Sequence, residues 1–176
     1  MELSYSPSGL DGPDACDVLR KEDIQALLGS PPTGFAIRRA DLAENLLFLG
    51  DGTVTYFTST TCEREPVSTG FLGHGRSWVH FTLRTYHDTA HAEATMRQRL
   101  DPQGSSFGPP VVLPVIGDDP GAVTPPVLGD RKVVFRVGRH LGELDYRDDT
   151  ESAESPEVLA ERVPPVARAI ANRLRG

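Results

Sequence analysis

Two cysteines, Cys16 and Cys62, are the residues whose chemistry can be read most directly from the sequence. Cys16 stands just before a short amphipathic segment, and Cys62 ends a threonine-rich run with the composition of a strand. A pair with no third cysteine predicts a single disulfide, which would place the chain outside the reducing cytosol. Two buried free thiols are the alternative, because a free cysteine packs well in a core.

Three histidines form a weaker pattern that could bind a metal ion. His87 and His91 are four residues apart around a predicted helix start, and His80 lies in the strand-like run before them. Three imidazoles could bind zinc and leave one coordination position open. The interpretation that we adopt is three solvent-exposed histidines, so we predict neither a metal site nor a cofactor.

Aromatic and cationic residues offer a third kind of site, a pocket for a ligand. Aromatic walls with a few polar groups are typical of small-molecule sites, and two arginines could bind an anionic group there. The candidate ligand-binding residues are Trp78, Arg84, Phe107, Arg136 and Tyr146. The alternative is that each aromatic residue belongs to the core, because aromatic residues make up only 7% of the chain.

No catalytic signature accompanies these residues. The Gly73-His74-Gly75 segment lacks the third glycine of a dinucleotide-binding loop, because Trp78 stands in its place. The His91-Ala92-Glu93 segment matches half of a zinc-deaminase signature, but the required Pro-Cys-x-x-Cys is absent. We therefore predict that the protein is not an enzyme and has no catalytic residues.

Composition and charge narrow the class of protein and its partners. The chain has 176 residues, of which 38% are hydrophobic and 24% charged, so it can form one globular domain with a real core. A net charge of −7 argues against nucleic acid, which needs clustered cations. No stretch approaches the ~18 apolar residues of a membrane helix.

Residues 1–13 are polar and contain Gly, Pro and Ser, so we predict a disordered arm before a single domain at residues 14–176. This arm lacks the basic and apolar pattern of a signal peptide. Either the chain is cytosolic with incidental cysteines, or it is a mature ectodomain with a signal sequence, and a lipid anchor, encoded upstream. We prefer the second, because a disulfide is expected.

The elements that would position these residues follow from hydrophobic periodicity. Helices are predicted at residues 21–28, at 89–100 with Asp88 as cap, and from Ser155-Pro156 onward, where Pro164-Pro165 should kink or split the helix. Strands are predicted at residues 35–39, 46–49, 53–62, 78–86, 132–137 and 140–147. Tight turns between them favour antiparallel pairing.

The segment 101–130, rich in Pro and Gly, is predicted to be a long connection with one short edge or connecting strand at 111–116. It is either a crossover around the sheet edge or a lid that binds a partner. The order of elements predicts an α+β domain, in which a curved antiparallel sheet packs against two or three helices gathered on one face and one disulfide joins Cys16 to Cys62.

Four places, which span most of residues 14–175, resemble a known group of proteins. The segment 14–29 resembles a Cys-x-x-Leu opening with its helix ended by glycine, Cys62 stands at the position of a strand cysteine, 127–130 resembles a Gly-Leu-Gly-Asp turn, and 133–146 resembles a closing hairpin. The group is that of small actinobacterial envelope lipoproteins of unassigned function. The extracytoplasmic sensor domains of some mycobacterial serine/threonine kinases are more loosely similar.

This chain departs from the group at two positions: Val127 replaces a glycine, and Arg64 replaces an aromatic residue. The resemblance implies an envelope-anchored binding or scaffolding domain with no catalytic residues to carry over. We therefore expect a non-enzymatic extracytoplasmic domain, secreted or in the cell envelope, that binds a ligand or an envelope protein. The alternative is a cytosolic interaction module or a small enzyme with a histidine-based metal site, which would have free thiols and bound zinc.

Overall fold

The computed structural model describes residues 10–28, 35–39, 43–48, 54–66, 78–103, 108–124, 131–147 and 156–176. In these residues the chain forms four helices, α1 (Ala15–Val18), α2 (Lys21–Leu28), α3 (Thr89–Leu100) and α4 (Pro156–Leu174). The strands are β1 (Phe35–Arg39), β2 (Ala43–Phe48), β3 (Val54–Pro66), β4 (Trp78–Tyr86), β5 (Val111–Ile116), β6 (Asp119–Val123), β7 (Arg131–Val137) and β8 (His140–Arg147).

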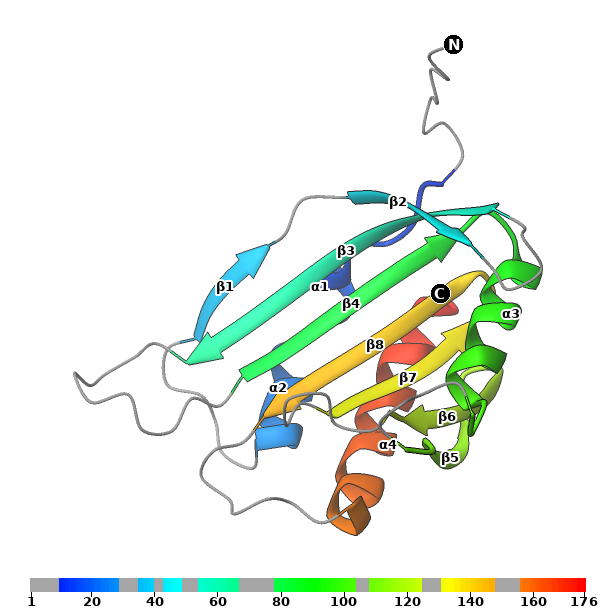
Figure 1. The fold of residues 1–176 in the computed structure, drawn as a ribbon. Coiled ribbons are helices and arrows are strands. Elements are labelled where there is room, and N and C mark those ends of the chain that lie inside the picture. Colours follow the sequence, from blue (N-terminus) through cyan, green and yellow to red (C-terminus); the bar gives the residue numbers. More distant parts are fainter. Residues whose placement is uncertain are drawn as a thin grey trace.

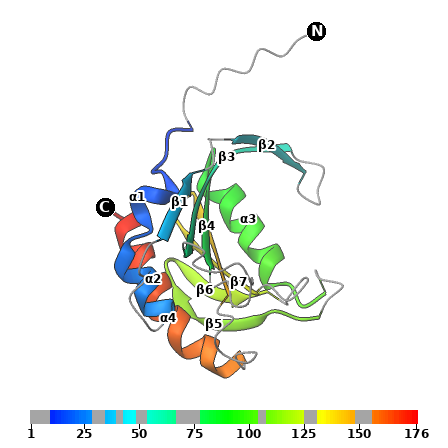
Figure 2. The same ribbon diagram turned by 90° about the vertical axis from the view of Figure 1, so that its left-hand side faces the viewer.

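The strands form one eight-stranded sheet in the order β1-β3-β4-β8-β7-β6-β5, with β2 also paired to β3 (Figure 1). Every pair of neighbouring strands is antiparallel. Figure 2 shows that the sheet is curved, with β2 and β5 both bending toward α3. The predicted fold class, a single α+β domain with a curved antiparallel sheet, is confirmed.

Helices cover both faces of the sheet. Helices α1, α2 and α4 lie on one face, and α3 lies on the other (Figure 2). We expected the helices on one face, and the position of α3 corrects that expectation. The physical reason is that the α3 face of the sheet carries its own apolar cluster, which must be covered: Phe57, Tyr86, Leu141, Val134 and Ala122 pack with Ala92 and Met96 of α3.

Alternation along the central strands produces the two faces. On β4, Val79, Phe81 and Leu83 are fully buried in the larger core beneath α1, α2 and α4. Phe81 lies opposite Leu144 of β8, which in turn lies opposite Val133 of β7, so apolar residues align across three strands. The intervening residues of β4, β8 and β7 point to the α3 face, because side chains alternate along a strand.

The predicted long connection contains a hairpin at the sheet edge. Strand β5 is the expected edge strand, and β6, which we did not predict, returns beside it and pairs with β7. Gly121 permits this close return, because a Cβ there would lie 2.7 Å from Cδ1 of the buried Ile116. The segment therefore extends the sheet at its edge. Residues 104–107 and 125–130 of the predicted connection lie outside the described residues.

Helix α4 is one helix that contains Pro164 and Pro165, so of the two expected effects, a kink or a split, the split is not observed. Val163, Val166 and Ile170 on either side of the proline pair are all buried in the larger core. This shared packing holds both parts of the helix on the sheet despite the lost backbone donors. None of the described helices has the length and apolar character to cross a membrane.

The folded domain begins earlier than predicted. Leu10 is buried, and its carbonyl accepts a hydrogen bond from Oγ1 of Thr58 on β3 at 3.2 Å. The carbonyl of Asp11 accepts one from Arg139 at 2.7 Å. Residues 10–13 therefore pack on the domain and are not part of a disordered arm, while residues 1–9 lie outside the described part of the chain.

Candidate functional site

The predicted disulfide between Cys16 and Cys62 is confirmed, with Cα atoms 4.9 Å apart. Cys62 is fully buried on β3, opposite Phe81 of β4. Cys16 is held in α1 by Asp14, whose side chain accepts a hydrogen bond from the Cys16 backbone at 2.8 Å. The alternative of two free thiols is contradicted. The disulfide therefore fastens the first helix to the sheet.

The three histidines considered as metal ligands, His80, His87 and His91, do not converge. His80 lies on β4, opposite Asp145 of β8. His87 directly follows the end of β4, about 20 Å further along the strand, and its side chain is exposed to solvent. His91 is in the first turn of α3, with Nδ1 2.7 Å from Oδ1 of Asp88. Asp88 also caps α3 by accepting from the His91 backbone, and this hydrogen bond lowers the pKa of Asp88. In the described residues, no group of three His, Cys, Asp or Glu side chains is placed to hold a metal.

The predicted ligand pocket is only partly described. Arg84 of β4 and Arg136 of β7 lie opposite the same residue of β8, Leu141, so both are on the α3 face. Tyr146 lies opposite Val79 in the ladder. Phe107 and the side chains of Trp78 and Tyr146 lie outside the described part of the structure. The structure thus places two of the five candidates on one face, separated by one strand.

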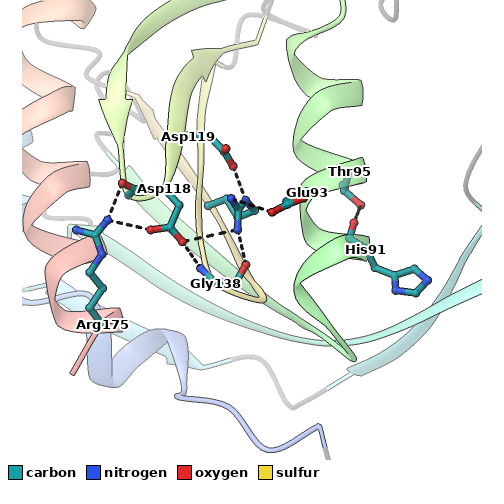
Figure 3. Close-up of polar contacts among 9 residues, drawn as sticks. His91, Glu93, Thr95, Asp118, Asp119, Gly138 and Arg175 are labelled. Carbon is teal, nitrogen blue, oxygen red and sulfur yellow. Dashed lines mark hydrogen bonds and ion pairs between the residues drawn. The ribbon is translucent and has the colours of Figure 1, made fainter.

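Arg136 is occupied by other groups of the protein. Its Nε donates to Asp119, its NH1 donates to the carbonyl of Gly138 at 2.8 Å, and Asp118 and Glu93 lie within 3.7 Å of its terminal nitrogens. The hydrogen bond to Asp119 raises the pKa of Arg136. These partners come from three parts of the fold: Glu93 from α3, Asp119 from β6, and Asp118 and Gly138 from two turns. Figure 3 shows the four of them surrounding the guanidinium group that they contact.

This arrangement joins the hairpin at the sheet edge to the turn between β7 and β8. Asp118 also accepts from the Gly138 backbone at 2.6 Å and from Arg175, just beyond α4, at 2.9 Å. The hydrogen bond from Gly138 lowers the pKa of Asp118, with Arg175 and Arg136 acting in the same direction. Arg136 is 6% exposed and serves the fold, so it has little capacity left for a ligand.

Arg84 belongs to a different group of charges, which we call the Glu143 cluster: Arg84, Arg99, Lys132 and Glu143. Glu143 is on β8, and its side chain is only 4% exposed. Its Oε1 lies 3.2 Å from Arg84 and 3.0 Å from Arg99 of α3, and its Oε2 lies 3.9 Å from Lys132 of β7. The guanidinium of Arg84 also lies over the Phe57 ring, 5.3 Å from its centroid. Three elements thus direct cations at one carboxylate.

Asp145 borders this cluster. Its Oδ2 lies 3.4 Å from Lys132, and its buried Oδ1 accepts no hydrogen bond from the described residues. Burial raises the pKa of Asp145 to about 6, although Lys132 acts in the opposite direction. In the ladder, Glu63, His80, Asp145 and Lys132 lie side by side on four neighbouring strands.

We identified Arg84 from the sequence but not the other members of the cluster. The available signal is the alternation on β8, where Leu144 points to the larger core and Glu143 and Asp145 occupy the opposite face. Asp145 also begins an acidic run that reads as a solvated linker, and this hides its partly buried position. Arg99 lies in the last turn of α3, where a basic residue is usually explained by the helix dipole.

Comparison with known proteins gives no relative: no protein-family model matches the chain, and neither the curated proteins nor the solved structures include a significant match. Function is therefore inferred from the fold and the site.

Proposed function

We propose that this protein is a non-enzymatic extracytoplasmic binding domain, secreted or held in the cell envelope, that binds a small ligand or an envelope protein on the α3 face. The observation that carries the proposal is the Cys16–Cys62 disulfide. Disulfides form and persist in oxidising compartments and are rare in the cytosol. The resemblance to small actinobacterial envelope lipoproteins agrees with the same location and stays a prediction.

The disulfide is part of the packing of the domain. It joins the first turn of α1 to β3. Ala15, which precedes Cys16, is fully buried, and its backbone N–H donates to Oγ1 of Thr60 at 2.8 Å. A cross-link between residues 46 apart removes many conformations from the unfolded chain. Because the disulfide is built into the packed domain, the protein is expected to fold in a compartment where disulfides form.

The binding role is supported by the α3 face. The Glu143 cluster presents partly exposed charged groups on β4, β7 and α3, which are regular elements. Side chains on strands and helices are positioned more precisely than those on loops, and this favours specific binding.

Thiol trapping in the source organism tests the location. Cells are quenched in acid, free thiols are alkylated with a maleimide that adds mass, and cytosolic and envelope fractions are separated with marker proteins. We expect the chain outside the cytosol with both cysteines blocked, and a sample reduced before alkylation gives the position of the shifted band. A cytosolic chain with two alkylated cysteines would overturn the proposed location.

A ligand screen followed by product analysis tests the binding role. The full chain with its disulfide intact is melted against a panel of neutral, anionic and cationic small molecules and envelope extracts. We expect at least one component to raise the melting temperature and to be recovered unchanged. Recovery of a chemically altered component, at a rate proportional to protein concentration, would show instead that the protein is an enzyme.

A further inference from the structure

We propose that the Glu143 cluster binds an oxyanion, the carboxylate or phosphate group of a small ligand, on the α3 face of the sheet. This inference rests on the proposed binding function and names the chemical class of the ligand. The ligand group would bind to Arg84, Arg99 and Lys132 from the solvent side. Glu143 would remain beneath them as the internal partner that holds the three cations together.

The charges of the cluster are unequal. Three cations face Glu143, and Lys132 also contacts Asp145, so three positive side chains meet two carboxylates. Within this group of five side chains, the positive charges exceed the negative charges by one when both carboxylates are ionised. This excess is local, because the whole chain carries a net charge of −7. A local positive potential on a negative molecule favours a small anion over an extended polyanion.

The donors of the cluster reach solvent, whereas its internal carboxylate does not. The side chains of Arg84, Arg99 and Lys132 are 21%, 35% and 44% exposed, against 4% for Glu143. Toward Glu143, each arginine uses one terminal nitrogen. A guanidinium has five N–H donors in a fork that matches an oxyanion, so donors remain for a second acceptor.

Arg136 on the same face provides a comparison, because acceptors of the protein itself surround its guanidinium group. It is 6% exposed and contacts Asp118, Asp119, Glu93 and the Gly138 carbonyl. Four acceptors thus surround one cation, whereas three cations share Glu143. Arg136 therefore has more acceptors than it needs, whereas the Glu143 cluster has more cations than carboxylates, and this points to the Glu143 cluster as the anion-binding group.

The cations are also held in place without a ligand. Arg84 packs on the Phe57 ring, Arg99 comes from α3, and Lys132 comes from β7. Since Glu143 draws all three together, they need little rearrangement to receive an anion, and preorganised groups lose less entropy on binding.

Sulfate is the first probe, because it remains a dianion at all pH values between 5 and 8. The full chain with its disulfide intact is titrated at low ionic strength, and backbone amide shifts are followed by NMR, with chloride at equal ionic strength as the reference. We expect saturable shifts confined to β4, β7, β8 and α3. Parallel titrations with acetate and methyl phosphate distinguish a carboxylate ligand from a phosphate ligand.

A pair of variants on α3 tests the assignment. Arg99→Gln should weaken sulfate binding by about tenfold, the loss of one charge-assisted hydrogen bond. Arg97→Gln removes an equal charge from an exposed position of the same helix and should leave the affinity unchanged. Both changes are at partly exposed or exposed side chains, so both proteins should fold.

Absence of a saturable sulfate effect, or equal weakening by Arg97→Gln and Arg99→Gln, would overturn the oxyanion site. If that happens while the chain is extracytoplasmic and another ligand class binds, the proposed function stands and only this inference fails. If the chain is cytosolic with free thiols, the proposed function fails, whatever the sulfate titration shows.

Discussion

The carboxyl group of Asp145 lies where ionisation is costly. Burial raises its pKa from the ordinary value of 3.8 to about 6, and Lys132 opposes this shift only in part. Among the described residues, the charged or titratable groups that face it are Lys132 of β7, His80 of β4 and Glu143 of its own strand. Because the folded state holds this proton more tightly than the unfolded state, the ionised carboxylate destabilises the fold at neutral pH.

Asp145→Asn should therefore stabilise the protein at pH 7.5. We expect a gain of about 1 kcal/mol in the free energy of unfolding, after allowing for solvent screening of a partly exposed group. The wild-type penalty disappears as the pH falls from about 6 to below 3.8, so the gain should shrink over that range. Urea denaturation at pH 7.5 and at pH 4 measures it.

Asp11→Asn provides the control for this comparison, because Asp11 is exposed and only its carbonyl is used by Arg139. Its unfolding free energy should match the wild type at both pH values. A gain for Asp145→Asn that is equal at pH 7.5 and pH 4 would contradict the assignment of the burial penalty to this carboxyl group.

Neutralising Glu143 should destabilise the fold, in contrast to neutralising Asp145, because three cations depend on the charge of Glu143. Glu143→Gln would leave Arg84, Arg99 and Lys132 without their shared carboxylate. We expect a loss of about 2 kcal/mol in unfolding free energy, less than for a fully buried pair because the cations reach solvent. Glu93→Gln, at a half-exposed partner of Arg136, should cost less than about 0.5 kcal/mol by the same urea assay. Equal costs for the two variants would contradict a special role for Glu143.

At the scale of elements, local sequence determines some of this fold and tertiary context the rest. Strand β4 and helix α3 have the predicted bounds, because β4 alternates apolar and polar residues and Asp88 caps α3. Strand β6 begins Asp-Pro-Gly, a sequence that disfavours strands. It is fixed instead by its ladder to β7 and by the ion pair between Asp119 and Arg136.

The candidate site was still less accessible from the sequence. Arg84 and Arg99 come from the consecutive elements β4 and α3, and Lys132 and Glu143 come from the later hairpin of β7 and β8. The meeting of these two parts of the chain depends on the register of β4, β8 and β7. A shift of one residue would move Glu143 to the larger core, so register decides the site. No local pattern specifies that register, whereas the disulfide was predictable because only two cysteines exist.

The hairpin of β7 and β8 gives a prediction about this register. Gly142 lies opposite Phe135, and a Cβ on Gly142 would approach the Phe135 ring to 2.6 Å. Phe135 is fully buried, so the ring cannot simply move into solvent. Gly142→Ala should therefore cost about 1–3 kcal/mol of unfolding free energy through overpacking.

A double-mutant cycle separates this steric cause from a general loss of strand stability. Phe135→Leu removes the ring edge that the new methyl group would meet, so the double variant should lose about 1 kcal/mol less than the two single losses added together. Urea denaturation of the four proteins gives the coupling energy. Strictly additive losses would show that the ring and Gly142 are not in the contact described.

At the scale of the whole molecule, a disulfide and an ion pair hold the N-terminal helices α1 and α2 against the sheet and the C-terminal helix α4. The disulfide joins α1 to β3. Beyond it, Asp23 of α2 is buried and accepts two hydrogen bonds from Arg173 of α4, at 2.6 and 2.7 Å, while Arg173 also donates to the Val18 carbonyl at 2.7 Å. The hydrogen bond to Asp23 raises the pKa of Arg173. The segment thus keeps a polar attachment when the disulfide is absent.

Reduction of the disulfide should therefore lower the stability of the domain and leave its sheet folded. The chain-entropy relation for a 46-residue separation gives a loss of about 4 kcal/mol, or a fall of roughly 10 °C in melting temperature. Below the new transition, hydrogen exchange should show faster exchange at the backbone amides of Ala15 and Leu19, at the two ends of α1, and unchanged protection in β4, β7 and β8. The Cys16→Ser/Cys62→Ser variant should melt like the reduced protein and ignore reductant. If reductant leaves the wild-type melting temperature unchanged, the disulfide is not what holds α1 to β3, and the Asp23–Arg173 pair with the buried face of the segment would have to carry that attachment alone.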